Sequence, residues 1–253
     1  MRLTGKVALV TGGGSGMGRA ICVKLASEGA DIAVNYSRRQ QGAEETAATA
    51  RTRGVRAVAI RADVSQDHEA RRLVAETVAQ LGRLDILVNN AGWTKFTPHR
   101  ELEALTEELL ERTWAINVKG PIYVTRASIP EMLKQGGGRI INVTSVSVDT
   151  GAGSSIIYAA SKAALATITK SLARAFARDN ILVNAIAPGL VDTGFVEWPP
   201  NTVQKIASTN PLGRIPTVDD VARAALFLAA DVSGVTAQTI YVDCGVTALQ
   251  PTF

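Results

Sequence analysis

Seven short apolar runs constrain the fold of this chain more than any other feature. They are rich in Val, Ile and Leu, and they lie at residues 7–10, 32–34, 57–60, 86–88, 140–143, 181–186 and 240–242. A strand with one wet face would alternate apolar and polar residues, whereas these runs are almost continuously apolar, so both faces of each strand are expected to be covered. Segments of helical character separate the runs. Right-handed crossovers then predict an α/β fold with a doubly wound parallel sheet of about seven strands.

Three hydroxyl residues mark expected helix starts between these runs. Ser65, Thr106 and Thr217 each stand shortly before acidic side chains, a pattern typical of a helix N-terminus. In a doubly wound sheet, ligands bind at the carboxyl ends of the strands. Functional residues are therefore expected just after each apolar run.

Composition limits the domain organisation and the class of partner. The 253 residues, 46% of them hydrophobic, can bury one core, and no linker divides them, so residues 1–253 are predicted to form a single domain. No apolar run approaches the ~18 residues of a membrane span, and no signal peptide precedes the first run, which predicts a soluble, cytoplasmic protein without a membrane partner. The net charge of +4 is spread along the chain, so no nucleic-acid partner is expected.

The cysteines and histidines carry no metal or redox pattern. Cys22 and Cys244 form neither a CxxC motif nor a zinc spacing, and they are expected to be buried thiols without a disulfide. His68 and His99 have no metal-ligand neighbours and are expected to be solvated. The sequence therefore predicts no metal site.

A glycine-rich turn follows the first apolar run, at residues 11–18, and opens a helical segment. Glycine permits positive φ and close approach of backbone to ligand, and a helix N-terminus offers free N–H groups to a pyrophosphate. The spacing is TGxxxGxG, because Met17 stands where the common GxGxxG motif has its third glycine. The turn predicts a dinucleotide site, and the alternative is a glycine-rich turn without a ligand.

The end of the second apolar run indicates which dinucleotide is preferred. Many dinucleotide folds place an acidic residue there to bind the adenosine ribose, but this chain has Tyr36 followed by Ser37, Arg38 and Arg39. A hydroxyl and two guanidiniums without a carboxylate favour NADP(H), with NAD(H) as a further possibility. The alternative is that the two arginines begin a solvated helix face.

Tyr158 and Lys162 lie four residues apart in an alanine-rich helical segment, which places the phenol and the ammonium on one face. A free phenol, with a pKa near ~10, is a poor base at neutral pH. A nearby ammonium, together with a positively charged oxidised nicotinamide, would stabilise the phenolate. The pair is therefore a candidate for proton transfer, although YxxxK alone is a weak signal.

Several motifs occur together and in one order, and in combination they resemble the short-chain dehydrogenase/reductase family over nearly the whole chain. They are TGxxxGxG at 11–18, NNAG at 89–92, Asn117, Ser145, the Tyr158/Lys162 pair and the Pro-Gly at 188–189. The resemblance implies a single Rossmann-type domain that binds NAD(P). Within the family the chain looks most similar to the 3-oxoacyl-carrier-protein reductase branch, but residues 129–131 lack the basic side chains with which that branch docks its carrier protein.

The resemblance also implies a catalytic tetrad. Tyr158 would give a proton to the carbonyl oxygen of the substrate, and Ser145 would donate a hydrogen bond to the same oxygen. Lys162 would bind the nicotinamide ribose, and Asn117 would hold a water molecule that links Lys162 to solvent. Ser145 is preferred over the neighbouring hydroxyls because its distance to Tyr158 matches the family.

The family's cofactor contacts carry over to a further set of positions. Besides Tyr158 and Lys162, they are Gly12, Ser15, Met17, Gly18, Ser37, Arg38, Asp63, Val64, Asn90, Val191 and Thr193. Asp63 has an alternative role, as the acidic residue that ends a strand before Ser65.

The segments that line substrate pockets in this family supply mostly apolar residues here: Trp93, Phe96, Ser147, Phe195 and Trp198. Residues 189–211 form the one irregular excursion and are expected to act as a substrate lid. Lys95 is the only cation noted in these segments, which favours a neutral, fairly hydrophobic substrate.

The expected function is hydride transfer between NADP(H) and a small ketone or secondary alcohol, with 3-oxoacyl reduction as one form of it. The alternatives are an NAD-dependent alcohol, sugar-alcohol or steroid dehydrogenase, and a dinucleotide sensor without turnover. The family default implies a homotetramer in which the segment 235–246 packs against a second subunit.

Overall fold

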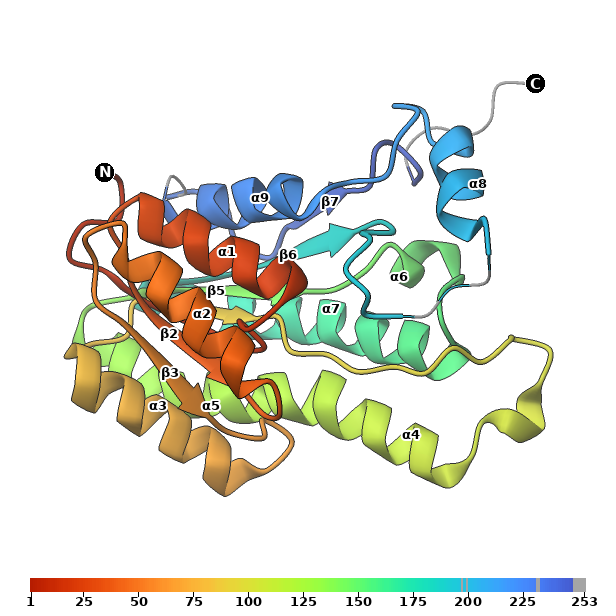
Figure 1. The fold of residues 1–253 in the computed structure, drawn as a ribbon. Coiled ribbons are helices and arrows are strands. Elements are labelled where there is room, and N and C mark those ends of the chain that lie inside the picture. The colour runs from red at the N-terminus through yellow and green to blue at the C-terminus, as the bar shows by residue number, and fades with distance from the viewer. Residues whose placement is uncertain (197, 199, 231–232, 248–253) are drawn as a thin grey trace.

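The strands form one parallel sheet, in the order β3-β2-β1-β4-β5-β6-β7 (Figure 1). The structure, a computed structural model, describes residues 1–196, 198, 200–230 and 233–247. The strands are β1 (Val7–Val10), β2 (Asp31–Tyr36), β3 (Ala57–Arg61), β4 (Ile86–Asn89), β5 (Gly138–Val143), β6 (Ile181–Pro188) and β7 (Thr239–Val242). Every predicted run forms a strand. The chain reverses direction across the sheet between β1 and β4, which confirms the doubly wound topology.

Helices cover both faces of the sheet. They are α1 (Gly16–Ser27), α2 (Gln40–Arg51), α3 (Asp67–Leu81), α4 (Glu107–Trp114), α5 (Gly120–Lys134), α6 (Ser147–Thr150), α7 (Ile156–Phe176), α8 (Thr202–Thr209) and α9 (Val218–Ala230). One apolar cluster joins the sheet to α1, α2 and α9, and a second joins it to α3, α5 and α7. Since helices cover both faces of the sheet, the central strands β1 and β4 are buried at every position.

Of the three helix starts predicted from hydroxyl residues, two are confirmed. The Thr106 hydroxyl accepts the N–H of Leu109 at the start of α4. Thr217 and Asp220 exchange backbone and side-chain hydrogen bonds at the start of α9, as a capping box does. The prediction for Ser65 was wrong. Gln66 is the residue that precedes α3, and the Ser65 hydroxyl donates to Asp63 instead.

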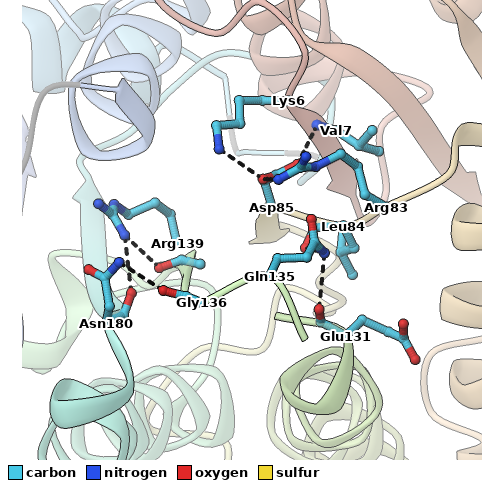
Figure 2. Close-up of polar contacts among 11 residues, drawn as sticks. Lys6, Val7, Arg83, Leu84, Asp85, Glu131, Gln135, Gly136, Arg139 and Asn180 are labelled. Atoms are coloured by element: carbon cyan, nitrogen blue, oxygen red, sulfur yellow. Dashed lines mark hydrogen bonds and ion pairs between the residues drawn. The ribbon is translucent and has the colours of Figure 1, made fainter. Parts of the chain in front are cut away.

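Polar contacts join β1 and β4 at their amino ends, opposite to the expected ligand edge (Figure 2). Asp85, just before β4, is buried, and its carboxylate accepts from the Val7 N–H, from Lys6 Nζ at 3.1 Å and from Arg83 Nη2 at 2.6 Å. Burial alone would raise the pKa of Asp85, but these donors hold it below its usual range. Next to this group, Gln135 donates to the carbonyl of Leu84, which ties the end of α5 to the sheet.

Two expectations about the whole chain can be compared with the structure. Cys22 and Cys244 are both free and buried, as predicted. Over the described residues, no helix combines the length and the hydropathy needed to cross a bilayer.

Candidate active site

A cleft of about 540 Å³ opens at the carboxyl ends of the strands. Its walls come from the turn after β1, the ends of β2 and β3, the NNAG segment after β4, and the faces of α4 and α7. The cleft brings together twelve of the residues expected to serve the cofactor or the chemistry: Gly12, Ser15, Met17, Gly18, Ser37, Arg38, Asp63, Val64, Asn90, Tyr158, Lys162 and Thr193. Segments far apart in the sequence therefore form one site.

The glycine turn has the geometry that its sequence predicts. Gly12 has φ of +62°, a conformation that L side chains rarely adopt. A Cβ at Gly18 would lie 2.3 Å from the Gly12 carbonyl oxygen, so only glycine allows α1 to start so close to the turn. Ser15 precedes α1 without capping it, which leaves N–H groups of the first turn free for an anion. This cradle fits a pyrophosphate.

Asn35, which the sequence analysis did not place in the site, holds the turn in position. Its side chain is buried in β2, where Oδ1 accepts the Gly12 N–H at 3.2 Å and Nδ2 donates to the Ala62 carbonyl at 3.0 Å. A polar residue inside an otherwise apolar strand is the signal that could have identified it, because a buried amide needs hydrogen-bond partners.

Two arginines stand where β2 ends at the cleft. Ser37, Arg38 and Arg39 follow β2, are exposed and line the cleft, and Arg39 Nη1 donates to the Ser15 hydroxyl at 3.3 Å. The second guanidinium therefore turns towards the glycine turn, while Arg38 makes no such contact among the described residues.

Asp63, Val64 and Asn90 line the same region but have structural partners as well. The Asp63 carboxylate accepts both the N–H and the hydroxyl of Ser65. The Asn90 side-chain amide donates to the Thr11 carbonyl at 2.9 Å, which links the NNAG segment to the glycine turn. The structural role considered for Asp63 is thus present, and its role towards adenine stays a prediction.

Tyr158 lies on the first turn of α7, beside Ser145. Burial raises the pKa of Tyr158 to about 12, and a hydrogen bond with the Ser145 side chain opposes this effect. The Ser147 N–H donates to Ser145 Oγ at 3.2 Å and so orients that hydroxyl. In the protein alone the phenol is therefore protonated at neutral pH, and the lower pKa expected from the nearby Lys162 ammonium is not found, because burial has the larger effect.

Lys162 is buried one turn further along α7. Its Nζ donates to the Val143 carbonyl at 2.7 Å and lies 5.7 Å from the centroid of the Tyr158 ring. Burial lowers the pKa of Lys162 to about 8. The ammonium is thus close enough to influence the phenol.

Asn117 lies on a π-helical turn, Ala115–Lys119, between α4 and α5. Its Oδ1 accepts the Trp93 N–H at 2.8 Å, and its Nδ2 donates to the Trp93 carbonyl and to Ser161 Oγ, both at 3.0 Å. Asn117 therefore ties the NNAG loop to α7. Its role in holding a water stays a prediction.

The residues expected around the substrate fall into two groups. Trp93 and Phe195 line the cleft. Phe96 and Trp198 lie outside it and contact each other edge to face, with ring centroids 5.8 Å apart. Ser147 is buried beside Ser145, and its Oγ has no partner among the described residues.

Val191 and Thr193, expected to hold the nicotinamide, also differ in placement. Val191 packs against the apolar cluster of α1 and α9, whereas Thr193 lines the cleft next to Gly16. The expected lid, residues 189–211, includes α8, and Glu197 and Pro199 of that segment lie outside the described residues.

Arg112 is a cleft residue that the sequence analysis missed. It lies on α4, and its guanidinium carbon is 4.2 Å from the centroid of the Trp93 ring. Lys95 was the only cation noted in the segments expected to line the substrate, and Arg112 lies outside those segments. Lys95 is exposed and does not line the cleft.

No metal site is built into the described ranges, because no three His, Cys, Asp or Glu side chains there come close enough to hold an ion.

Comparisons with known proteins show which family this chain resembles. A family profile described as Enoyl-(Acyl carrier protein) reductase matches residues 12–247. An uncharacterized oxidoreductase of Thermotoga maritima is 38% identical, over 98% of this chain and all of its own length. The 3-oxoacyl-[acyl-carrier-protein] reductase FabG of Staphylococcus aureus is 37% identical, over 97% of this chain and 99% of its own. Levodione reductase has a similar structure, with a TM-score of 0.92, 31% identity and coverage of 98% of this chain and 100% of its own.

The fold and the cleft define an oxidoreductase that uses a nicotinamide dinucleotide. Within that class the chain belongs to the short-chain dehydrogenase/reductase family, because the family profile and these relatives cover nearly all of its length.

Proposed function

We propose that this protein reduces a small carbonyl compound with NADPH, and oxidises the corresponding secondary alcohol in reverse. The observation that carries this proposal is that Tyr158, next to Ser145, faces the cleft that also holds the glycine turn. The names of two relatives, a 3-oxoacyl reductase and levodione reductase, support reduction of a ketone.

In this mechanism Tyr158 donates the proton to the substrate oxygen. A phenol with a pKa of about 12 carries its proton at neutral pH and is ready to donate it. Ser145, oriented by the Ser147 N–H, hydrogen-bonds the same oxygen and stabilises its developing charge. The nicotinamide, when bound, supplies the hydride.

After the proton has left, the buried ammonium of Lys162 stabilises the Tyr158 phenolate by its charge. The same ammonium would bind the nicotinamide ribose. Asn117 accepts the Trp93 N–H and donates to Ser161, the residue next to Lys162. Together these residues keep the acid, its cationic neighbour and the loop over the substrate in one arrangement.

The preference for NADP(H) rests on the charge at the end of β2. The strand ends at Tyr36, and the residues after it bring two guanidiniums and no carboxylate to the cleft. A 2′-phosphate gains charge-assisted hydrogen bonds there.

Initial rates with NADPH and NADH on a panel of ketones, and in the reverse direction with alcohols, test this function. NADPH should be preferred, and Arg38→Ala should raise the KM for NADPH about tenfold while leaving the KM for NADH nearly unchanged. Arg53→Ala, which removes an exposed arginine after α2, is the matched control. An NADH preference in the unaltered enzyme would overturn the cofactor choice.

We also propose that the enzyme is a cytoplasmic homotetramer. Two separate surfaces expose large apolar side chains, one with Leu110 and Ile122 and the other with Phe227 and Tyr241. Two distinct self-contacts are what a tetramer with two-fold axes requires.

A further inference from the structure

We propose that Arg112, held against the face of Trp93, binds an oxyanion on the substrate, and that the preferred carbonyl compound is an oxo acid. This inference rests on the proposed function and names the substrate class of the same cleft. It replaces the neutral substrate that the sequence favoured.

The position of Arg112 on α4 directs it to the cleft. Ala115 and Ile116, three and four residues further on, line the cleft as well, so this face of the helix looks onto the ligand space. Arg112 is half-buried there. Its side chain is therefore part of the cleft wall.

The charge of Arg112 has no carboxylate partner among the residues described. Glu108 lies four residues earlier, on the same side of the helix, and is exposed. On other helices, arginines in this relation form ion pairs, as Arg71 does with Asp67 and Arg223 with Asp219. Arg112 contacts Trp93 instead, so its charge is left for a ligand.

The stacking fixes the guanidinium without using its donors. A guanidinium that lies over an aromatic ring keeps its N–H groups in its own plane, where they fit a carboxylate or a phosphate. The backbone of Trp93 is anchored, because its backbone N–H donates to Asn117 and its carbonyl accepts from the same side chain. Asn117 also donates to Ser161 on α7, so the loop that carries Trp93 is tied to the helix that carries Tyr158.

The other cations of the cleft are placed to contact the cofactor. Arg38 and Arg39 stand at the adenosine end, and Lys162 is buried against the Val143 carbonyl. Arg112 is the cation that these cofactor contacts do not use, and it lies next to Trp93, with Phe195 as a second apolar wall. An oxo acid with an apolar body matches this combination.

Matched pairs of ketones test the proposal: oxo acids of increasing chain length and their methyl esters. The unaltered enzyme should prefer the acids. Arg112→Gln should lower kcat/KM for the acids about 10-fold to 100-fold, with the esters changed less than about threefold. Arg112→Lys should recover only part of the loss, because a lysine lacks the planar fork.

Lys95→Gln is the matched control, since it removes a cation from the same loop outside the cleft, and it should leave both classes unchanged. An equal loss for acids and esters in Arg112→Gln would contradict the proposal, as would a rise in the KM for NADPH without discrimination between the two classes. A phosphonate ketone in the same series shows whether phosphate or carboxylate is preferred.

Measurements of carboxylate binding distinguish the anion site at Arg112 from the proposed reaction. Saturated carboxylates should quench tryptophan fluorescence in the complex with NADP, and Arg112→Gln should abolish the quenching. If no ketone is reduced but this binding persists, the reaction is wrong and the anion site stands. If ketones are reduced but no carboxylate binds, the anion site is wrong and the reaction stands.

Discussion

Burial acts in opposite directions on the two ionisable side chains of α7 that face the cleft. It raises the pKa of Tyr158 to about 12 and lowers the pKa of Lys162 to about 8. Both shifts follow from the cost of holding a charge away from water. The phenol is therefore kept protonated, while the amine titrates close to neutral pH.

The affinity for NADPH should depend on the protonation of Lys162. Its charged form binds the ribose better, so the Kd should be nearly constant below neutral pH and should increase as pH rises through about 8. Fluorescence titrations at several pH values measure this. Lys162→Met should bind more weakly and lose this pH dependence, and the same increase in both proteins would contradict the assignment.

At the residue scale, the sequence predicts best where a motif fixes the spacing. Tyr158, Lys162 and Ser145 are found from their distances along the chain, because those distances are set by one helix and one loop. Arg112 and Asn35 could not be found this way. The orientation of Arg112 depends on its contact with Trp93, which is distant in sequence. Asn35 belongs to none of the motifs, and its place at the end of a buried strand shows only that its amide needs partners, not which groups they are.

The glycine turn and α1 approach each other closely where α1 begins. A Cβ at Gly18 would lie 2.3 Å from the Gly12 oxygen and 2.5 Å from Asn90 Nδ2. Gly18→Ala should therefore push the turn away from α1, destabilise the fold by about 1–3 kcal/mol and weaken NADPH binding. Thermal unfolding and NADPH titration measure both effects.

Gly234→Ala is the control for this substitution, because no atom of the described residues lies within 4 Å of the added methyl and the backbone there is not in the left-handed region. It should leave stability and NADPH binding nearly unchanged. Equal behaviour of the two variants would show that the close approach at Gly18 does not matter.

The amino ends of β1 and β4 are joined by Asp85 (Figure 2). Asp85→Asn removes a buried charge that donors on three residues satisfy. It should lower the free energy of unfolding by about 2 kcal/mol at pH 7, less than for a fully buried pair because Lys6 and Arg83 are half-exposed. Asp179→Asn, at an exposed position, should have no such effect.

The difference in stability between the original protein and Asp85→Asn should change with pH in one direction. The folded-state pKa of Asp85 is below its usual value, so its stabilisation is present above about pH 4 and is lost as pH falls through the folded pKa. The gap in Tm between the original protein and Asp85→Asn should stay constant from neutral pH to about pH 5 and then narrow. A gap that widens in acid would contradict this account.

Element boundaries follow the sequence closely in the sheet and less closely at the start of α3 and the end of α4. Continuous apolar runs identify every strand, and the central strands are buried on both faces, whereas the edge strand β7 is partly exposed. The start of α3 was placed on Ser65 because its hydroxyl precedes acidic residues, but that hydroxyl bonds Asp63. The π-helical turn at Asn117 has no sequence signature, since it arises from the contacts of that side chain with Trp93 and Ser161.

In the whole molecule the site lies at the carboxyl ends of the strands, whereas exposed large apolar side chains lie on α4, α5, α9 and β7. Sedimentation should give a mass four times the 26.7 kDa of one chain. Phe227→Glu, on α9, should divide the tetramer into dimers, because a charge there would be buried without a partner. A monomer at micromolar concentration in the unaltered protein would contradict the tetramer.

The central claim is that Tyr158 supplies the proton to the substrate. It is tested most directly by single-turnover reduction of a ketone in Tyr158→Phe, beside a titration of the same variant with NADPH. The account predicts that the rate falls by about 10²-fold to 10⁴-fold, the usual contribution of a general acid, while the Kd for NADPH stays within about twofold. A rate within about tenfold of the original enzyme, with NADPH still bound, would show that another group donates the proton.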